Sequence, residues 1–172
     1  MENIVLGGGC FWCLEAAYQL IKGVTKITSG YSGGETINPS YETVCDGKTG
    51  HAEVVEIEYD HTVITLNELL IIFWKIHDPT SLNRQGGDVG TQYRSCIFYL
   101  NEGQKKIIET QIKALTENKT FASPIVTQVA PLDIFYVAEE YHQNYYLKHP
   151  EQGYCQFVIG PKLSKLKEIL DN

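Results

Sequence analysis

The sequence predicts an α+β fold, a ferredoxin-like α/β sandwich in which helices cover a β-sheet. The main evidence is the order of the predicted elements, which begins strand, helix, strand, strand, helix, strand. The chain has 172 residues, of which 43% are hydrophobic and 20% are charged, as in an ordinary globular protein. This length suits one domain, so we expect residues 1–172 to form a single domain.

Apolar runs and turn residues define the first half of the fold. A short apolar run over residues 3–6 predicts a buried strand, and the glycines that follow predict a turn. Helical spacing predicts a helix over residues 10–20, with Gly23 just past its end. Strands are expected at residues 24–31 and 52–59, where β-forming residues recur.

The second half contains more helix. Helical spacing over residues 66–77 ends at Asp78-Pro79, because a residue before proline is disfavoured in helical conformation. Further elements are a strand at 95–100, a helix at 102–117 with Asn101 as its N-cap, a strand at 125–129, a short polar helix beyond Ala138 and a last helix at 161–170.

Two long segments, residues 32–50 and 80–93, are rich in glycine and polar residues and are predicted to be loops. Long loops inside a compact domain are usually functional, so we expect them to carry the active site. Residues 151–154 have the composition of a mobile C-terminal tail.

The charge and hydropathy patterns exclude several kinds of partner. The net charge of −7 argues against general affinity for nucleic acid or anionic membranes, which require clustered Lys and Arg. No run of 18 apolar residues predicts a transmembrane helix, and the first residues do not resemble a secretory signal. The five cysteines do not suggest a disulfide framework, so we expect reduced thiols in a cytoplasmic protein.

The strongest local signal is Gly9-Cys10-Phe11-Trp12-Cys13. Cys10 lies where a glycine turn leads into a helix, and backbone N–H groups there favour a thiolate. We therefore expect the pKa of Cys10 to lie below that of a free thiol. Cys13 is close enough to form a disulfide with Cys10. Redox chemistry is the favoured interpretation, with metal binding or two buried structural thiols as the alternatives.

A metal site and a nucleotide site both fit poorly. One CxxC motif supplies two ligands, and no second CxxC or close His pair follows at zinc spacing. The glycine turn has Trp12 where a dinucleotide motif needs glycine. We expect no metal and no prosthetic group.

The motif resembles the signature of the methionine sulfoxide reductase A family, and the likeness extends over nearly the whole chain. The matching segments occur in the family's order: Gly9–Trp12, Gly30–Gly34, Asn38–Tyr41, Gly50–Glu53, His77–Pro79, Asp88, Gly90–Ser95, Glu139–Gln143 and Gly153–Cys155.

The resemblance implies a role for each matched residue. Cys10 corresponds to the catalytic nucleophile, and Glu53 to the acid that protonates the sulfoxide oxygen. Phe11 and Trp12 correspond to the apolar wall around the substrate methyl group. The remaining catalytic residues correspond to two phenols that hydrogen-bond the oxygen and a polar group near the nucleophile: Tyr41, Tyr93 and Asp88.

The chemistry of sulfoxides supports these assigned roles. A sulfoxide is a poor electrophile until its oxygen is protonated, so the nucleophile needs an acid beside it. Glu53 can serve as an acid near pH 7 only if apolar surroundings raise its pKa, and it shares a strand face with Val55 and Ile57. Tyrosine O–H groups would stabilise negative charge on the oxygen. Without the ordered match, a lone Glu would be read as solvated, and loop tyrosines as packing groups.

The resemblance implies reduction of methionine-(S)-sulfoxide, free or in peptides, with a sulfenic acid on Cys10 as intermediate. A second cysteine would convert it to a disulfide, which a thioredoxin-like reductant would reduce. Cys13 and Cys155 are both candidates for this resolving cysteine. Cys13 is favoured slightly, although a bridge within a helical turn can be strained, and a relay through both is possible.

Two other functions compete with this interpretation. A thioredoxin-like CxxC disulfide oxidoreductase would also place its motif at a helix start, but it usually has a βαβ unit before the motif, and only nine residues precede Cys10. A peptide-binding or metal-binding module is the second alternative. Reduction of insulin disulfides, or stoichiometric zinc, would favour these alternatives respectively.

Overall fold

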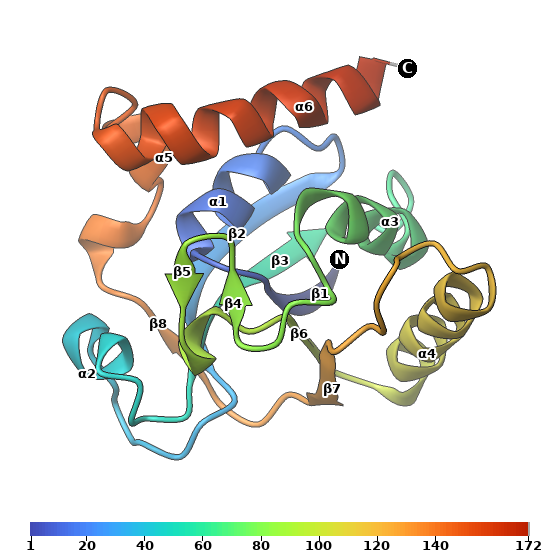
Figure 1. Ribbon diagram of the computed structural model, residues 1–172, viewed down its shortest axis with the longest axis horizontal. Helices are drawn as coiled ribbons and strands as arrows, with labels where there is room; N and C mark the ends of the chain where they lie inside the picture. The colour runs from blue at the N-terminus through green and yellow to red at the C-terminus, as the bar shows by residue number, and fades with distance from the viewer. Residues whose placement is uncertain (172) are drawn as a thin grey trace.

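A computed structural model describes residues 1–171 as a mixed α/β structure around one curled sheet (Figure 1). The sheet has six strands in the order β7-β6-β1-β3-β2-β8. In chain order they are β1 (Glu2–Gly7), β2 (Val24–Ser32), β3 (Ala52–Tyr59), β6 (Cys96–Tyr99), β7 (Gln128–Pro131) and β8 (Phe135–Val137). A separate hairpin is formed by β4 (Arg84–Gln85) and β5 (Asp88–Val89).

The centre of the sheet is antiparallel. β1 pairs with β3 from Glu2 opposite Tyr59 to Leu6 opposite Val55, and β3 pairs with β2 on its other side. The only parallel pair among the described strands is β6 with β7. β3 therefore has a strand on each side, β1 and β2, and most of its residues are buried.

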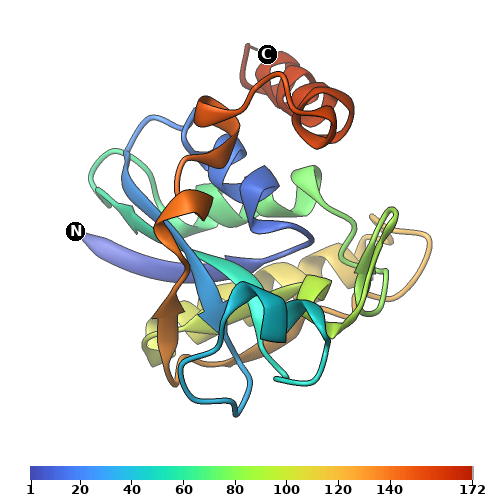
Figure 2. The same cartoon turned by 90° about the vertical axis from the view of Figure 1, so that its left-hand side faces the viewer.

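Helices cover one face of this sheet in two layers. α1 (Phe11–Tyr18) packs on β2 and β3, and α6 (Gly160–Asp171) packs on α1. Figure 2 shows α6 on the outside with α1 beneath it. α3 (Leu66–Ile76) packs against α4 (Glu102–Glu117). The main core is formed by buried residues from β1, α1, β3, α3 and α6, from Ile4 to Leu166.

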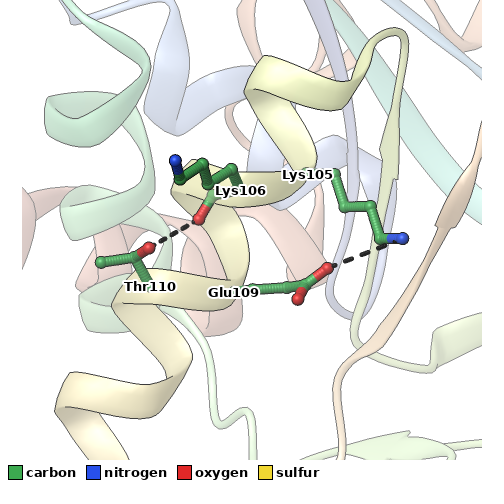
Figure 3. Close-up of polar contacts among 4 residues, drawn as sticks. All are labelled: Lys105, Lys106, Glu109 and Thr110. Atoms are coloured by element: carbon green, nitrogen blue, oxygen red, sulfur yellow. Dashed lines mark hydrogen bonds and ion pairs between the residues drawn. The ribbon is translucent and has the colours of Figure 1, made fainter.

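α4 lies at the edge of the molecule, and most of its surface is solvated. Its N-cap is Asn101, whose side chain accepts from the backbone N–H of Gln104 at 2.9 Å, as predicted. On its outer face Lys105 pairs with Glu109 at 3.9 Å, and Thr110 donates to a backbone carbonyl one turn earlier (Figure 3). Such exposed contacts add little stability, so α4 depends on its buried side chains.

The two predicted loops are more ordered than expected. Residues 32–50 include α2 (Tyr41–Cys45), whose N-cap Ser40 exchanges hydrogen bonds with Thr43 in a capping box. Residues 80–93 include the β4–β5 hairpin and the 3-10 helix η1 (Thr91–Tyr93). Neither was predicted, because elements of two to five residues are too short for a periodic pattern.

Two predictions about strands were inaccurate. The strand expected at 125–129 is β7, at Gln128–Pro131, where its position is set by parallel pairing with β6. The strand β8 was missed, because it forms three residues of pairing with β2. The predicted strand at 52–59 and helix at 102–117 match the observed bounds.

The C-terminal segment is helical and packed. Two short helices, η2 (Glu140–His142) and α5 (Tyr145–Lys148), lead to the π-helical η3 (Cys155–Ile159), which continues into α6. Cys155 is fully buried within the core. Of the tail expected to be mobile at residues 151–154, residues 153 and 154 are helical and lead into the segment that packs on α1. Within residues 1–171, no helix has the length and hydrophobicity needed to span a membrane.

Candidate active site

Cys10 is the N-cap of α1, and a tight turn places it there. The turn includes Gly9, which has φ +85° and donates its N–H to the carbonyl of Tyr93 at 3.1 Å. A Cβ on Gly8 would lie 2.8 Å from the ring of His77, so only glycine fits against that ring. The Cys10 side chain is half-buried, and its backbone is extended.

The ring of His77 packs against the turn at Gly8. Its Nε2 lies 2.7 Å from the hydroxyl of Ser95, and burial lowers its pKa to about 4. The ring is therefore neutral at physiological pH. The motif His77-Asp78-Pro79 had no role assigned by sequence, and the structure gives it one in positioning the cysteine turn.

Glu53 meets Cys10 from the centre of the sheet. It lies on β3 with 1% of its side chain exposed, and its Oε1 accepts the backbone N–H of Phe11 at 3.1 Å. Burial raises its pKa to about 8, although hydrogen bonds from Phe11 and Cys10 oppose the shift. A carboxyl group with a raised pKa, as predicted, thus lies beside Cys10, on the same face as Val55 and Ile57.

The expected low pKa of Cys10 was wrong for the substrate-free protein. Burial raises the pKa of its thiol well above the ordinary value, and the nearby charges of Glu53 and Cys13 raise it further. A hydrogen bond from the Trp12 backbone acts in the opposite direction but does not prevail. The helix start favours a thiolate, but desolvation and neighbouring acidic groups outweigh it.

The two predicted phenols come from the two long segments. Tyr41 begins α2, and its backbone N–H donates to Glu139 at 3.0 Å, while its ring lies 4.4 Å from that of His142. Tyr93 ends η1. Burial raises the pKa of both hydroxyls, and the charge of Glu53 contributes in each case. Both phenols therefore stay protonated and can donate.

Aromatic rings surround the start of α1. Phe11 is fully buried, with its ring 5.7 Å from that of Tyr31. Trp12 is half-buried, stacks on Tyr145 at 3.7 Å and donates its indole N–H to His142 at 3.1 Å. The Nε2 atom of His142 is buried without a hydrogen-bond partner among the described residues.

Tyr154 links two of the remaining predicted residues, Asp88 and Cys13. Tyr154 donates its hydroxyl to Asp88 at 2.8 Å, and the same oxygen lies 3.7 Å from the Cys13 sulfur. Cys13 is 8% exposed, whereas Cys155 is fully buried. Within residues 1–171, no cluster of three or more His, Cys, Asp or Glu side chains could hold a metal ion.

Sequence reasoning missed several residues that hold the site together. Glu15 is 1% exposed, and its carboxylate accepts from Ser29 and from the backbone N–H of Tyr145. Glu139 accepts from the hydroxyl of Tyr31 at 2.9 Å. The run Glu139–Gln143 was noticed as a family match without a role. An isolated acidic residue on an otherwise apolar helix is the signal that could have identified Glu15.

Comparison with known sequences gives a consistent result. The family model for peptide methionine sulfoxide reductase matches residues 2–172. The peptide methionine sulfoxide reductase MsrA of Nautilia profundicola is 56% identical over 169 residues, covering 98% of this chain and 96% of the relative. MsrA of Acinetobacter baumannii strain AYE is 55% identical, covering 96% and 94%.

Solved structures agree with the sequence comparison. Mxr1 from Saccharomyces cerevisiae in reduced form has a TM-score of 0.82 and 38% identity, covering 90% of this chain and 88% of that one. Methionine sulfoxide reductase A of Corynebacterium diphtheriae has a TM-score of 0.78 and 36% identity, covering 88% and 76%. Mxr1 in complex with Trx2 has a TM-score of 0.58 and 28% identity, covering 84% of each chain.

Proposed function

Because this chain belongs to the peptide methionine sulfoxide reductase family, a family of oxidoreductases, we propose that it reduces methionine-(S)-sulfoxide through Cys10. The substrate is the sulfoxide of methionine, free or within a peptide. The observation that carries the proposal is the buried, protonated carboxyl of Glu53 beside the Cys10 sulfur. The choice of epimer follows from the family, since each class of these reductases acts on one sulfoxide hand.

Glu53 supplies the proton that the sulfoxide oxygen needs. With a pKa of about 8 it is mostly protonated at pH 7. The Cys10 thiolate attacks the sulfoxide sulfur while the sulfoxide oxygen takes the Glu53 proton. The oxygen then passes to the Cys10 sulfur as the substrate S–O bond breaks. The proton that Cys10 loses can return to the carboxylate. The products are methionine and a sulfenic acid, with no net change of protons.

The other site residues orient the substrate. The phenols Tyr41 and Tyr93 stay protonated and donate to the oxygen as negative charge develops on it. Trp12 and Phe11 provide aromatic surface for the methyl group and the polarisable sulfur. Asp88, held by the Tyr154 hydroxyl, is the polar group beside the nucleophile.

Cys13 is the favoured resolving cysteine. It lies within the first turn of α1, and its backbone N–H bonds to the Cys10 carbonyl at 3.1 Å. Cys155 is fully buried in η3, so it could react only after the C-terminal segment moves. The proposal includes movement of the C-terminal segment and a relay, in which a first disulfide at Cys13 is exchanged for one that involves Cys155. A thioredoxin-like reductant then regenerates the dithiol by exchange, as the complex of the yeast relative with Trx2 suggests.

We further propose a ferredoxin-like core within one domain. The strand order β6-β1-β3-β2, with α1 and α3 in the connections, supports that topology. The main hydrophobic core extends from Ile4 to Leu166, and a smaller cluster is formed by residues of the same central strands, which supports a single domain. A cytoplasmic location is proposed from the odd number of cysteines, which suits a reducing compartment.

A reductase assay with separated S and R sulfoxides of a methionine peptide, with dithiothreitol as reductant, tests the proposal. The wild-type protein should reduce the S form alone, and Cys10→Ser should abolish turnover. Cys96→Ala is the matched control, because Cys96 is a buried thiol whose pKa is raised to about 12 and it should not react. Reduction of insulin disulfides without sulfoxide reduction would instead favour the CxxC disulfide oxidoreductase.

A further inference from the structure

The sulfur of Cys13 is in contact with the C-terminal segment as well as with its own helix. α6 lies across α1 (Figures 1 and 2), and Lys162 belongs to its first turn. The Lys162 ammonium is 4.0 Å from the Cys13 sulfur, and the Tyr154 hydroxyl is 3.7 Å from it. Lys162 thus brings a positive charge from a residue about 150 positions away to a buried thiol.

Acidic groups face Cys13 from the other elements around it. Asp88 on β5 and Glu53 on β3 raise the pKa of this thiol, and burial raises it most. Lys162 is the strongest influence that lowers it, followed by Tyr154. The balance between these groups determines how readily Cys13 becomes a thiolate, which is the form that attacks.

The Tyr154 hydroxyl donates to Asp88 rather than to the Cys13 sulfur. Its hydroxyl has one proton, and that proton is donated to Asp88 at 2.8 Å, which is a shorter contact than the one to sulfur. The Lys162 ammonium has three N–H donors, and among the described residues its one polar contact is with the Cys13 sulfur, so it can stabilise the sulfur without giving up another contact.

We propose that Lys162 is a positioning residue for the resolving step, in which its ammonium group stabilises the Cys13 thiolate that attacks the oxidised Cys10. This inference rests on the proposed function and deepens it. Lys162 does not contact the substrate in this scheme. It acts on the second cysteine after methionine has been formed.

The step balances in atoms and electrons. Cys13 loses its thiol proton to solvent, and the thiolate attacks the sulfur of the Cys10 sulfenic acid. The S–S bond forms as the S–O bond of Cys10 breaks, and the oxygen leaves as hydroxide and takes a proton to become water. The Cys13 sulfur is oxidised and the Cys10 sulfur is reduced, so no external oxidant is needed.

A single-turnover experiment on the full chain tests the inference. Reduced protein is mixed with one equivalent of a methionine-(S)-sulfoxide peptide at pH 6–9, then quenched with dimedone. Mass spectrometry follows methionine, the sulfenic adduct and the Cys10–Cys13 disulfide. In Lys162→Met, methionine should still form, the sulfenic adduct should accumulate, and the disulfide should form about tenfold more slowly at pH 7. Its pH profile should move up by about one unit, because one pKa unit changes the thiolate fraction tenfold.

Matched variants separate charge from structure. Lys162→Arg should restore the wild-type pH profile, since it keeps the positive charge. Lys165→Met, three residues along the same exposed helix face, should behave as wild type. High salt should reduce the difference between wild type and Lys162→Met, because it screens an exposed charge.

The possible failures are distinguishable. If Lys162→Met forms the disulfide at the wild-type rate and pH, this inference is wrong, while methionine formation keeps the proposed function intact. If Cys13→Ser still yields a first disulfide at the wild-type rate, the choice of resolving cysteine and this inference both fail. Absence of methionine from the wild-type reaction would refute the proposed function itself.

Discussion

Glu53 is a carboxyl group that the fold keeps out of water. Burial raises its pKa from 4.5 to about 8, with the charge of Asp88 as a smaller cause. The folded protein therefore holds a proton on Glu53 between these two pH values that the unfolded chain does not hold. Folding stability falls as the pH rises through this window, because the native state must either keep that proton or bury a charge.

Replacement of Glu53 with Gln removes both the acid and the buried charge. We expect Glu53→Gln to be nearly inactive and, above about pH 8, more stable than wild type. The full pKa difference corresponds to a gain on the order of 5 kcal/mol, which should vanish below the unfolded pKa. Urea unfolding from pH 4 to 9 measures it. A variant less stable than wild type at pH 9 would contradict the prediction.

The pH dependence of activity follows from the same group. In the proposed mechanism the first step uses protonated Glu53, so steady-state assays across pH should show methionine formation declining as the pH rises through about 8. Cys10 needs to lose its proton in the same step, and its pKa is raised. The enzyme thus operates with both groups protonated before substrate arrives.

At the scale of elements, the structure has one N-cap on a helix that carries a site residue and another on a helix away from the site. Ser40 caps α2, the short helix that carries Tyr41, and Asn101 caps the long α4 away from the site. Both accept a backbone N–H at the third position of their helix. A five-residue helix depends strongly on its cap, because it has few internal hydrogen bonds.

The two caps form a matched pair of variants. Ser40→Ala should lower kcat/KM several-fold by loosening Tyr41, with little change in the urea midpoint. Asn101→Ala should reduce the free energy of unfolding by about 1 kcal/mol and leave activity unchanged. Steady-state assays and urea titrations of both variants test this. If Ser40→Ala lowers stability and leaves activity unchanged, the Ser40 cap does not position Tyr41 for catalysis.

At the scale of the whole molecule, the C-terminal helix is the outer layer over α1. Leu166 is 1% exposed and belongs to the main core, whereas Leu170 in the same helix is 44% exposed. The helix predicted at 161–170 is thus anchored to the core by its buried side chains. The packing of α6 places Lys162 beside Cys13, the proposed resolving cysteine.

Leucine truncations measure how firmly α6 is packed. Leu166→Ala should reduce the free energy of unfolding by about 2–5 kcal/mol, as expected for a buried leucine. Leu170→Ala should change it by less than about 0.5 kcal/mol, as expected for a surface position. Urea denaturation of both variants is the measurement. A negligible effect of Leu166→Ala would show that α6 contributes little to the stability of the core.

The sequence by itself determined the features that depend on local patterns. Alternation along 52–59 placed Glu53 on the buried strand face, and the glycine turn before Cys10 placed that residue at a helix start. The helix at 102–117 and its Asn101 cap also follow from neighbouring residues. These features are readable because periodicity and capping act within a few residues of chain.

Only the tertiary structure decided the features that depend on distant segments. The pKa of Cys10 was expected to fall and instead rises, because burial and Glu53 act through space. The contact of Lys162 with Cys13 joins two helices far apart in the chain. Desolvation and charge interactions depend on distance in space rather than on sequence separation, so no local pattern could reveal them.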